Sequence, residues 1–442
     1  MKFLFADSMD HVDPGYDFLN DRYSEGREIY WDDKYPHEIM DRLPYDGMLI
    51  SHGIVGDHKV CGKYTEAQAM RFRRVGAREF LRLKGKKYDD FPVFGDCGAF
   101  TYVREEMPPY TALDMVEFYG DAGFSHGCSV DHIIFDFDRS DKNPDIPSSE
   151  AIRRFEITVN NAEEFKSEAR TLGKKFTPLG VVQGWSPSSM ANAATKLTKM
   201  GYDYLAVGGM VPLNAASIHA CLSAIREAIP QKTKLHILGF AKAGQISEFF
   251  DYGIASFDTT SPLLRAFKEA RKNYYFPNAD GELDFYTAIR IPQAHDNPKL
   301  ARLVKSGDFN QDDLIRREKN ALKLIREFDK GAASLEDTLI AVMDYTKPII
   351  WDPKATEEAT QRRLNENEKR YKRTLIDKPW KRCNCSICRE ISIEVMIFRA
   401  SNRNKRRGIH NLGVYNDYLK SIRLVGKNGK YEKIRRYQSA AE

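Results

Sequence analysis

Short apolar segments alternate with helical patterns along most of residues 45–260. Each apolar segment is as long as a buried strand, and a segment with helical periodicity usually separates it from the next one. We expect strands over residues 2–6, 47–51, 92–95, 132–136, 179–183, 204–207, 235–239 and 255–258, with helices over 148–172, 188–200, 215–228 and 245–252. Repeated strand–helix units predict an α/β fold, and their number favours a closed (β/α)8 TIM barrel over an open sheet.

Polar residues or glycines follow most of the predicted strands. In FPVFGDCGAF, residues 91–100, a buried strand runs into a carboxylate, a thiol and two small residues. Because the carboxyl ends of barrel strands converge on one mouth, such residues are candidates for ligand binding. At any single position, the alternative is a strand followed by an Asp-initiated turn or a helix cap. The candidates are Asp96, Asp136, Gln183, Gly208, Gly209, Gly239 and Asp258.

Three cysteines are crowded together near the C-terminal end of the chain. Cys383, Cys385 and Cys388 have the spacing Cys-x-Cys-x-x-Cys, and His410 follows them. Three thiolates and one imidazole form a closed tetrahedral zinc site, and its lack of an open position makes the Zn2+ structural. Free surface thiols are the alternative interpretation.

The positive charge is concentrated in the same region. Residues 381–442 contain fifteen Lys or Arg against five Asp or Glu, whereas the whole chain carries a net charge of only +5. This asymmetry predicts a polyanionic partner, most simply a nucleic acid, although a solvated basic tail is also compatible with it. We assign nucleic-acid binding to Arg265, Arg403, Lys405, Arg406 and Arg407.

The chain has the composition of a cytoplasmic globular protein. Its first ten residues hold only a four-residue apolar run, and no segment approaches 18 uncharged apolar residues, so we expect neither export nor a membrane partner. Seven cysteines, an odd number, argue against a disulfide framework. The missing Gly-x-Gly-x-x-Gly and P-loop patterns argue against dinucleotide and P-loop nucleotide binding.

The strand–helix rhythm stops near residue 266. Charged helical patterns over 312–329 and 354–372 follow, separated by loops that contain proline. We therefore predict a barrel catalytic domain over 1–266, a charged, largely helical insertion over 267–380, and a basic Cys3His zinc subdomain with the last barrel helix over 381–442.

Several motifs, taken in order, resemble the tRNA-guanine transglycosylase superfamily. They are GDCGAF at 95–100, FD at 135–136, VVQG at 181–184, VGGM at 207–210, LGF at 238–240, FD at 257–258, and the cysteine cluster with HNLGVY after it. The resemblance implies a base exchange in which guanine leaves its sugar and a 7-deazaguanine replaces it.

The resemblance also implies roles for individual residues. Asp258 corresponds to the nucleophile, which forms a covalent aspartyl-glycosyl intermediate, and Asp96 to the general acid/base. The residues that correspond to the base site are Asp136, Gln183, Gly208, Gly209, Met210, Cys97 and Gly239.

Departures from the tRNA enzymes bear on the substrate. This chain has Asp-Cys-Gly-Ala-Phe at 96–100 in place of Asp-Ser-Gly-Gly-Phe, and no Pro-Thr-Arg follows Asp258. The long insertion and the opening residues resemble the DpdA-type DNA 7-deazaguanine transglycosylases. This branch implies that the enzyme inserts a base such as preQ0 into DNA, and it leaves open both the need for accessory DNA-opening proteins and the oligomeric state.

Two other functions fit the sequence. One is a tRNA-guanine transglycosylase of the queuosine or archaeosine type. The other is a non-catalytic, zinc-stabilised nucleic-acid-binding protein, against which the presence of Asp96, Asp136 and Asp258 together argues.

Overall fold

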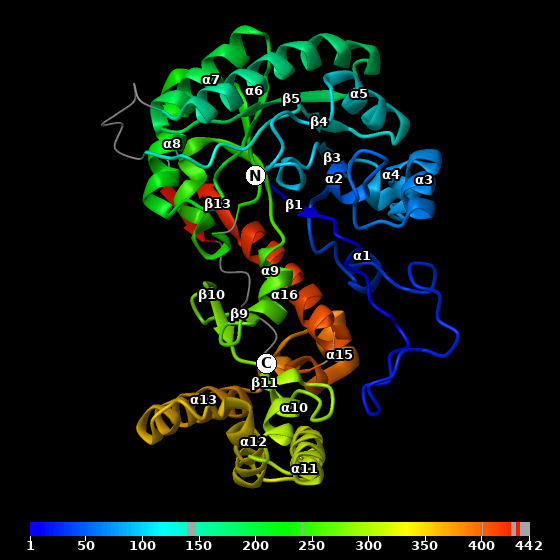
Figure 1. Ribbon diagram of the computed structural model, residues 1–442, viewed down its shortest axis with the longest axis vertical. Coiled ribbons are helices and arrows are strands. Elements are labelled where there is room, and N and C mark those ends of the chain that lie inside the picture. The colour runs from blue at the N-terminus through cyan, green and yellow to red at the C-terminus, as the bar shows by residue number, and fades with distance from the viewer. Residues whose placement is uncertain (139–146, 241, 400, 426–429, 434–442) are drawn as a thin grey trace. The chain divides into compact units, whose positions relative to one another are not determined.

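The computed structural model describes residues 1–138, 147–240, 242–399, 401–425 and 430–433 (Figure 1). These residues pack as two compact units. The first unit comprises Met1–Met9 and Tyr45–Ser261, and the second comprises Asp10–Pro44 and the chain from Pro262 onward. Residues 434–442, the end of the predicted zinc subdomain, lie outside the described residues. The predicted boundaries at 266 and 380 stay predictions.

The first unit is built on a closed barrel of eight parallel strands, which confirms the predicted fold class. Closure comes from the pairing of the first strand with the last, in the register Leu4↔Asp258. The strands are β1 (Lys2–Ala6), β2 (Gly47–Ser51), β3 (Val93–Asp96), β4 (His126–Cys128), β5 (Thr177–Val182), β6 (Tyr204–Val207), β7 (Lys234–Ile237) and β8 (Ile254–Asp258).

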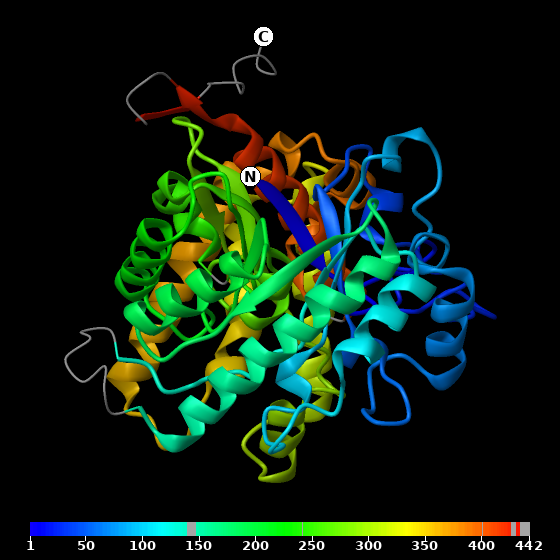
Figure 2. The same ribbon diagram turned by 90° about the horizontal axis from the view of Figure 1, so that it is seen from above.

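Helices cover the outer side of these strands (Figure 2). The main ones are α3 (Glu66–Val75), α5 (Ala112–Asp121), α6 (Ser149–Glu168), α7 (Pro187–Lys199) and α8 (Ala215–Ala228), with a 3-10 helix η4 (Ala243–Tyr252) before β8. Local sequence explains where they begin. Thr65, Thr111, Ser148, Ser186 and Asn214 each accept a hydrogen bond from a backbone N–H of the first turn.

One predicted strand is wrong. Residues 132–136 form no strand, and β4 lies upstream at His126–Cys128, between β3 and β5. Gly127 weakens the strand pattern there, and the structure needs it because a Cβ at this position would lie 2.4 Å from the Tyr119 ring. Residues 129–134 are buried in a connecting segment instead, and Phe135 is exposed. As a result, Asp131 follows the carboxyl end of β4 more closely than Asp136 does.

The second unit has its own hydrophobic core. Its helices are α10 (Pro298–Lys305), α11 (Gln311–Asp329), α12 (Leu335–Ile350), α13 (Glu357–Asp377), α14 (Pro379–Arg382), α15 (Ser386–Ile391) and α16 (Ser401–Ser421). A hairpin of β9 (Tyr274–Pro277) and β10 (Leu283–Tyr286) packs with them. Helices α11 and α13 agree with the two helices predicted in the insertion. Residues on both sides of position 380, such as Tyr345 and Ile409, share this core.

Short strand pairs complete the second unit. β11 (Ile289–Arg290) pairs in parallel with β12 (Ile397–Phe398), and β13 (Ile422–Val425) pairs with β14 (Lys430–Lys433). Within the described residues of both units, no helix has the length and apolar character needed to cross a bilayer.

Candidate active site and metal cluster

Three carboxylates lie close together at the carboxyl ends of the barrel strands. Asp96 ends β3, Asp258 ends β8, and Asp131 follows β4. Burial, followed by the negative charges of Asp258 and Asp131, raises the pKa of Asp96 to about 7. A carboxyl group with this pKa can both give and take a proton near neutral pH, as a general acid/base must.

Asp258 is buried, and one of its two oxygens is held by β7 and the residues after it. The Gly239 N–H donates to Oδ1 at 3.0 Å, and His236 Nε2 lies 3.3 Å from the same oxygen. Gly239 has φ +64°, and a Cβ there would lie 2.8 Å from Val211. The structure thus places Gly239 against the proposed nucleophile, while its predicted contact with the base stays a prediction.

Asp96 is held from two sides. The Ser51 hydroxyl and the Gly98 N–H donate to its carboxylate, whereas Oδ1 has no hydrogen-bond partner among the described residues. Gly98 has φ +79°, and a Cβ there would lie 2.6 Å from Ser51 Oγ. Glycine is therefore required after Asp96-Cys97, both for its backbone conformation and for the close approach of Ser51.

Asp131 organises a buried hydrogen-bonded cluster that sequence reasoning missed. Cys97 Sγ donates to Asp131 Oδ1 at 3.1 Å, and the Gln183 amide donates from Nε2 to Oδ2 at 2.7 Å. The Tyr102 hydroxyl donates to Cys97 Sγ at 2.9 Å. Burial raises the pKa values of both Asp131 and Cys97, so the Cys97 thiol keeps its proton.

Gln183 is 2% exposed, yet its Oε1 has no hydrogen-bond partner among the described residues. An ionised Asp131 carboxylate can accept hydrogen bonds but cannot donate them, so the Nε2–H of Gln183 faces it. Oε1 of the same amide is therefore left as an acceptor for another group. A Cβ at Gly209 would lie 3.2 Å from this oxygen, so small residues border it. The Gly208 N–H donates to the Val182 carbonyl at 3.0 Å, which leaves Gly209 as the better placed amide of the pair for a ligand. Met210, the next residue in the chain, is buried. Its predicted contact with the base stays a prediction.

Asp136 is not brought into this cluster. Its side chain is exposed, and its carboxylate accepts a hydrogen bond from Ser148, the N-cap of α6. Its predicted contact with the base stays a prediction. Asp131 was missed because the strand before it was placed too late. Gly127 weakens the strand pattern in the sequence, and its packing against Tyr119 is seen only in the structure.

The four predicted metal ligands lie together in the second unit. Their ligand atoms are within 4.8 Å of one another, and His410 Nδ1 lies 3.6, 3.3 and 3.4 Å from the sulfurs of Cys383, Cys385 and Cys388. His410 Nε2 is 2.8 Å from the Tyr275 carbonyl, to which it donates when Nδ1 is the free ligand atom. Three thiolates and an oriented imidazole therefore fit a metal ion.

The basic run near this cluster is internal. Arg403, Arg406 and Arg407 are each at most 1% exposed, and Lys405 donates to the His11 carbonyl at 3.1 Å. The structure thus corrects the prediction that these arginines present charge to a nucleic acid. Their spacing places them along α16, where long side chains reach acidic groups and carbonyls of the same unit.

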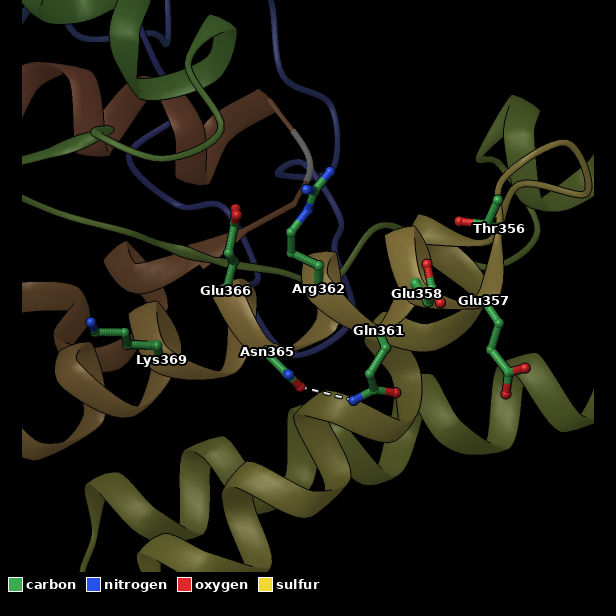
Figure 3. A pocket seen from close by; sticks show the side chains of 8 residues that line it. All are labelled: Thr356, Glu357, Glu358, Gln361, Arg362, Asn365, Glu366 and Lys369. Carbon is green, nitrogen blue, oxygen red and sulfur yellow. Dashed lines mark hydrogen bonds between the residues drawn. The ribbon is translucent and has the colours of Figure 1, made fainter.

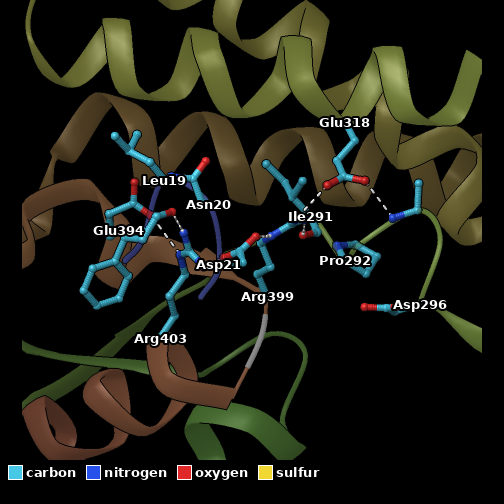
Figure 4. Close-up of polar contacts among 12 residues, drawn as sticks. Leu19, Asn20, Asp21, Ile291, Pro292, Asp296, Glu318, Glu394, Arg399 and Arg403 are labelled. Carbon is cyan, nitrogen blue, oxygen red and sulfur yellow. Dashed lines mark hydrogen bonds and ion pairs between the residues drawn. The ribbon is translucent and has the colours of Figure 1, made fainter. Parts of the chain in front are cut away.

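Figure 4 shows the acidic partners of Arg403 and of Arg399. Arg403 pairs with Asp21 and, through Nε at 2.7 Å, with Glu394. Arg399 bridges Asp21 and Glu318, with 2.5 Å to each. Arg407 bonds backbone carbonyls, and burial lowers its pKa to about 9. Buried charges of this kind need partners, and this network provides them.

Arg265 in α9 (Ser261–Lys268) is only partly buried. Its guanidinium lies 5.6 Å from the centre of the Phe285 ring. Its predicted role in nucleic-acid binding stays a prediction.

A shallow hollow lies along α13 in the second unit (Figure 3). Its lining is polar, of mixed charge, and drawn from a single stretch of chain: Thr356, Glu357, Glu358, Gln361, Arg362, Asn365, Glu366 and Lys369. This hollow has no buried polar cluster like the one around Asp131, so the barrel mouth is the better candidate for chemistry.

Comparison with known proteins agrees with this geometry. A profile of the family described as "Queuine tRNA-ribosyltransferase" matches residues 131–441. A protein named DNA-guanine transglycosylase from Salmonella montevideo is 40% identical over 433 residues, which cover 97% of this chain and 99% of that protein.

The raised pKa of Asp96 predicts a pH dependence of stability. Its folded-state value of about 7 exceeds the ordinary value of 3.8, so folding becomes less favourable as pH rises through this window. Asp96→Asn removes this loss. In thermal unfolding, we expect the Tm of the variant minus the Tm of wild type to be larger at pH 8 than at pH 4.

The matched control is Asp203→Asn, at an exposed aspartate before β6. It should follow the wild-type pH dependence. An Asp96→Asn protein whose Tm difference from wild type is the same at both pH values contradicts the raised pKa.

Proposed function

Because this chain belongs to the queuine tRNA-ribosyltransferase family, we propose that it is a base-exchange transglycosylase whose polynucleotide substrate is DNA. The observation that carries the DNA assignment is the 40% identity to a DNA-guanine transglycosylase across 97% of this chain. Coverage this complete includes the insertion over 267–380, the feature that departs most from tRNA enzymes. The proposed incoming base is a 7-deazaguanine such as preQ0.

In the proposed reaction, Asp258 attacks the anomeric carbon of a deoxyguanosine. An Asp258 carboxylate oxygen forms a bond to C1′ while the C1′–N9 bond breaks and its electron pair leaves with the purine. Asp96, in its protonated form, gives its proton to the departing guanine. In the second half, the incoming base gives its N9 proton to Asp96, and its nitrogen lone pair displaces Asp258 from C1′. Atoms and charge balance over the two halves.

The raised pKa of Asp96 supports this division of roles. A carboxyl group with a pKa of about 7 can exchange one proton with each base in turn, whereas the nucleophile must be ionised. The two charges also repel each other, which favours one proton shared at the site over two ionised groups.

We assign base recognition to the cluster around Asp131. The unpartnered Oε1 of Gln183 can accept an N–H of a guanine-like edge, and the Gly209 amide can donate to its carbonyl oxygen. Asp131 fixes the Gln183 amide in the orientation that presents this acceptor. Asp136 remains a second candidate acceptor from the connecting segment after β4.

A DNA substrate requires the target base to leave the stack. Extrusion of a paired base costs about a few kcal/mol, and stacking on aromatic side chains offsets part of it. Phe100, four residues after Asp96, is 62% exposed, and Phe135 is 56% exposed. We propose that these exposed rings stack on DNA bases, which explains why large apolar side chains face solvent near the active-site residues.

We propose that the cysteine cluster holds a structural Zn2+. Cys383, Cys385, Cys388 and His410 supply four ligands, which leaves no open position for a reacting water. The ion would hold α14, α15 and α16 together and stabilise the second unit.

The activity is tested by incubating the protein with radiolabelled guanine and, in parallel, duplex DNA, single-stranded DNA and bulk tRNA. We expect label to enter DNA and not tRNA, and unlabelled preQ0 to compete for the same site. Heat-denatured protein is the control. Label that enters tRNA alone overturns the DNA assignment, and the protein is then a tRNA enzyme of the same family.

The zinc proposal predicts about one zinc per chain by elemental analysis of the purified protein. Cys385→Ser should lose most of this metal and lower Tm, because three ligands bind Zn2+ far more weakly than four. The exposed Cys61, which lies outside the cluster, provides the control Cys61→Ser. A Cys385→Ser protein with unchanged metal content and Tm contradicts the assignment.

A further inference from the structure

A row of polar groups crosses the apolar interior of the barrel below the proposed nucleophile. The Tyr204 hydroxyl lies 2.6 Å from Ser256 Oγ, and Ser256 Oγ lies 2.6 Å from His236 Nδ1. His236 Nε2 then lies 3.3 Å from Asp258 Oδ1. All four residues are buried, and residues such as Phe94 and Leu179 surround them. Buried polar groups of this kind need an explanation.

Proton counting gives the row a direction. Asp258 accepts but does not donate when it is ionised, so Nε2 of His236 must carry the proton that faces it. In the neutral imidazole, Nδ1 is then an acceptor, which requires the Ser256 hydroxyl to donate to it. Ser256 in turn accepts from the Tyr204 hydroxyl. The opposite direction would place the Nε2 lone pair against the carboxylate, where the two repel.

The row ends on the same Asp258 oxygen that the Gly239 N–H already holds at 3.0 Å. Two donors thus converge on Oδ1, one from the backbone after β7 and one from the side chain of His236 within β7. Nε2 has no aligned hydrogen bond among the described residues, but at 3.3 Å a small rotation of either group forms one. Catalytic hydrogen bonds often tighten in this way when substrate binds.

We propose that His236 is a positioning residue for Asp258, held in one tautomer by Ser256 and Tyr204, and that it directs attack on C1′ through Oδ2. The inference rests on the proposed function. As the Oδ2–C1′ bond forms, the C1′–N9 electron pair leaves with the purine, and His236 keeps its Nε2 proton. In the ester that results, Oδ1 is the carbonyl oxygen, and the Nε2–H of His236 donates to it, which keeps the group oriented for the return step.

Three variants separate positioning from packing. His236→Phe keeps a ring of similar size but removes the donor, whereas His236→Gln keeps an N–H donor near the position of Nε2. Ser256→Ala removes only the group that selects the tautomer. For each variant, the base-exchange kcat, the KM for the free base and the single-turnover rate of guanine release are measured on the DNA that wild type modifies.

We expect His236→Phe to lower kcat about 100-fold with the base KM within about twofold of wild type. His236→Gln should restore kcat to within about tenfold of wild type, and Ser256→Ala should lower it about tenfold. If His236→Phe does not fold, Ser256→Ala decides by the same split between kcat and KM.

A wild-type kcat in both His236→Phe and Ser256→Ala overturns the inference. So does an equal loss in His236→Phe and His236→Gln accompanied by a raised KM, since that is the pattern of general damage to the site. In these cases wild type still exchanges bases, so the proposed function stands. A wild type that exchanges no base on any polynucleotide overturns the proposed function, and this inference with it.

Discussion

Burial of neighbouring carboxyl groups at the barrel mouth is the constraint on which this site depends. Parallel strands that close into a barrel bring residues from β3, β4 and β8 to one end, although they are far apart in sequence. Asp96, Asp131 and Asp258 therefore cannot all be ionised without cost. A hydrogen-bond donor stabilises each carboxylate: Ser51 donates to Asp96, Gln183 donates to Asp131, and the backbone amide after β7 donates to Asp258. One carboxyl group still holds its proton near neutral pH, which is the property that base exchange requires.

Much of this could be predicted from sequence because it depends on local pattern. Strand–helix alternation predicted the closed barrel, and the cysteine spacing predicted the grouping of three cysteines with His410. The error at β4 had a tertiary cause: the packing of Tyr119 on Gly127 selects a strand that hydrophobicity alone does not mark. That shift of a few residues hid Asp131 and directed attention to Asp136.

Charge was the other point at which sequence reasoning failed. A basic run normally indicates a solvated or nucleic-acid-binding face, but burial depends on partners that are distant in sequence. Asp21, for example, lies nearly 400 positions before Arg403, and no local pattern links them. The buried ion pairs use the positive charge internally, so much of the basic character of α16 serves the stability of the second unit. The possible role of His236 was missed for a similar reason, because a histidine inside a predicted strand is usually interpreted as a core residue.

The role of Asp258 can be tested by measuring the mass of the protein after rapid denaturation during reaction with a guanine-containing DNA oligonucleotide. If Asp258 is the nucleophile, we expect an adduct whose mass equals protein plus oligonucleotide minus one guanine, attached to the peptide that carries Asp258. An adduct on the Asp96 peptide, or none under conditions in which exchange proceeds, would contradict this role.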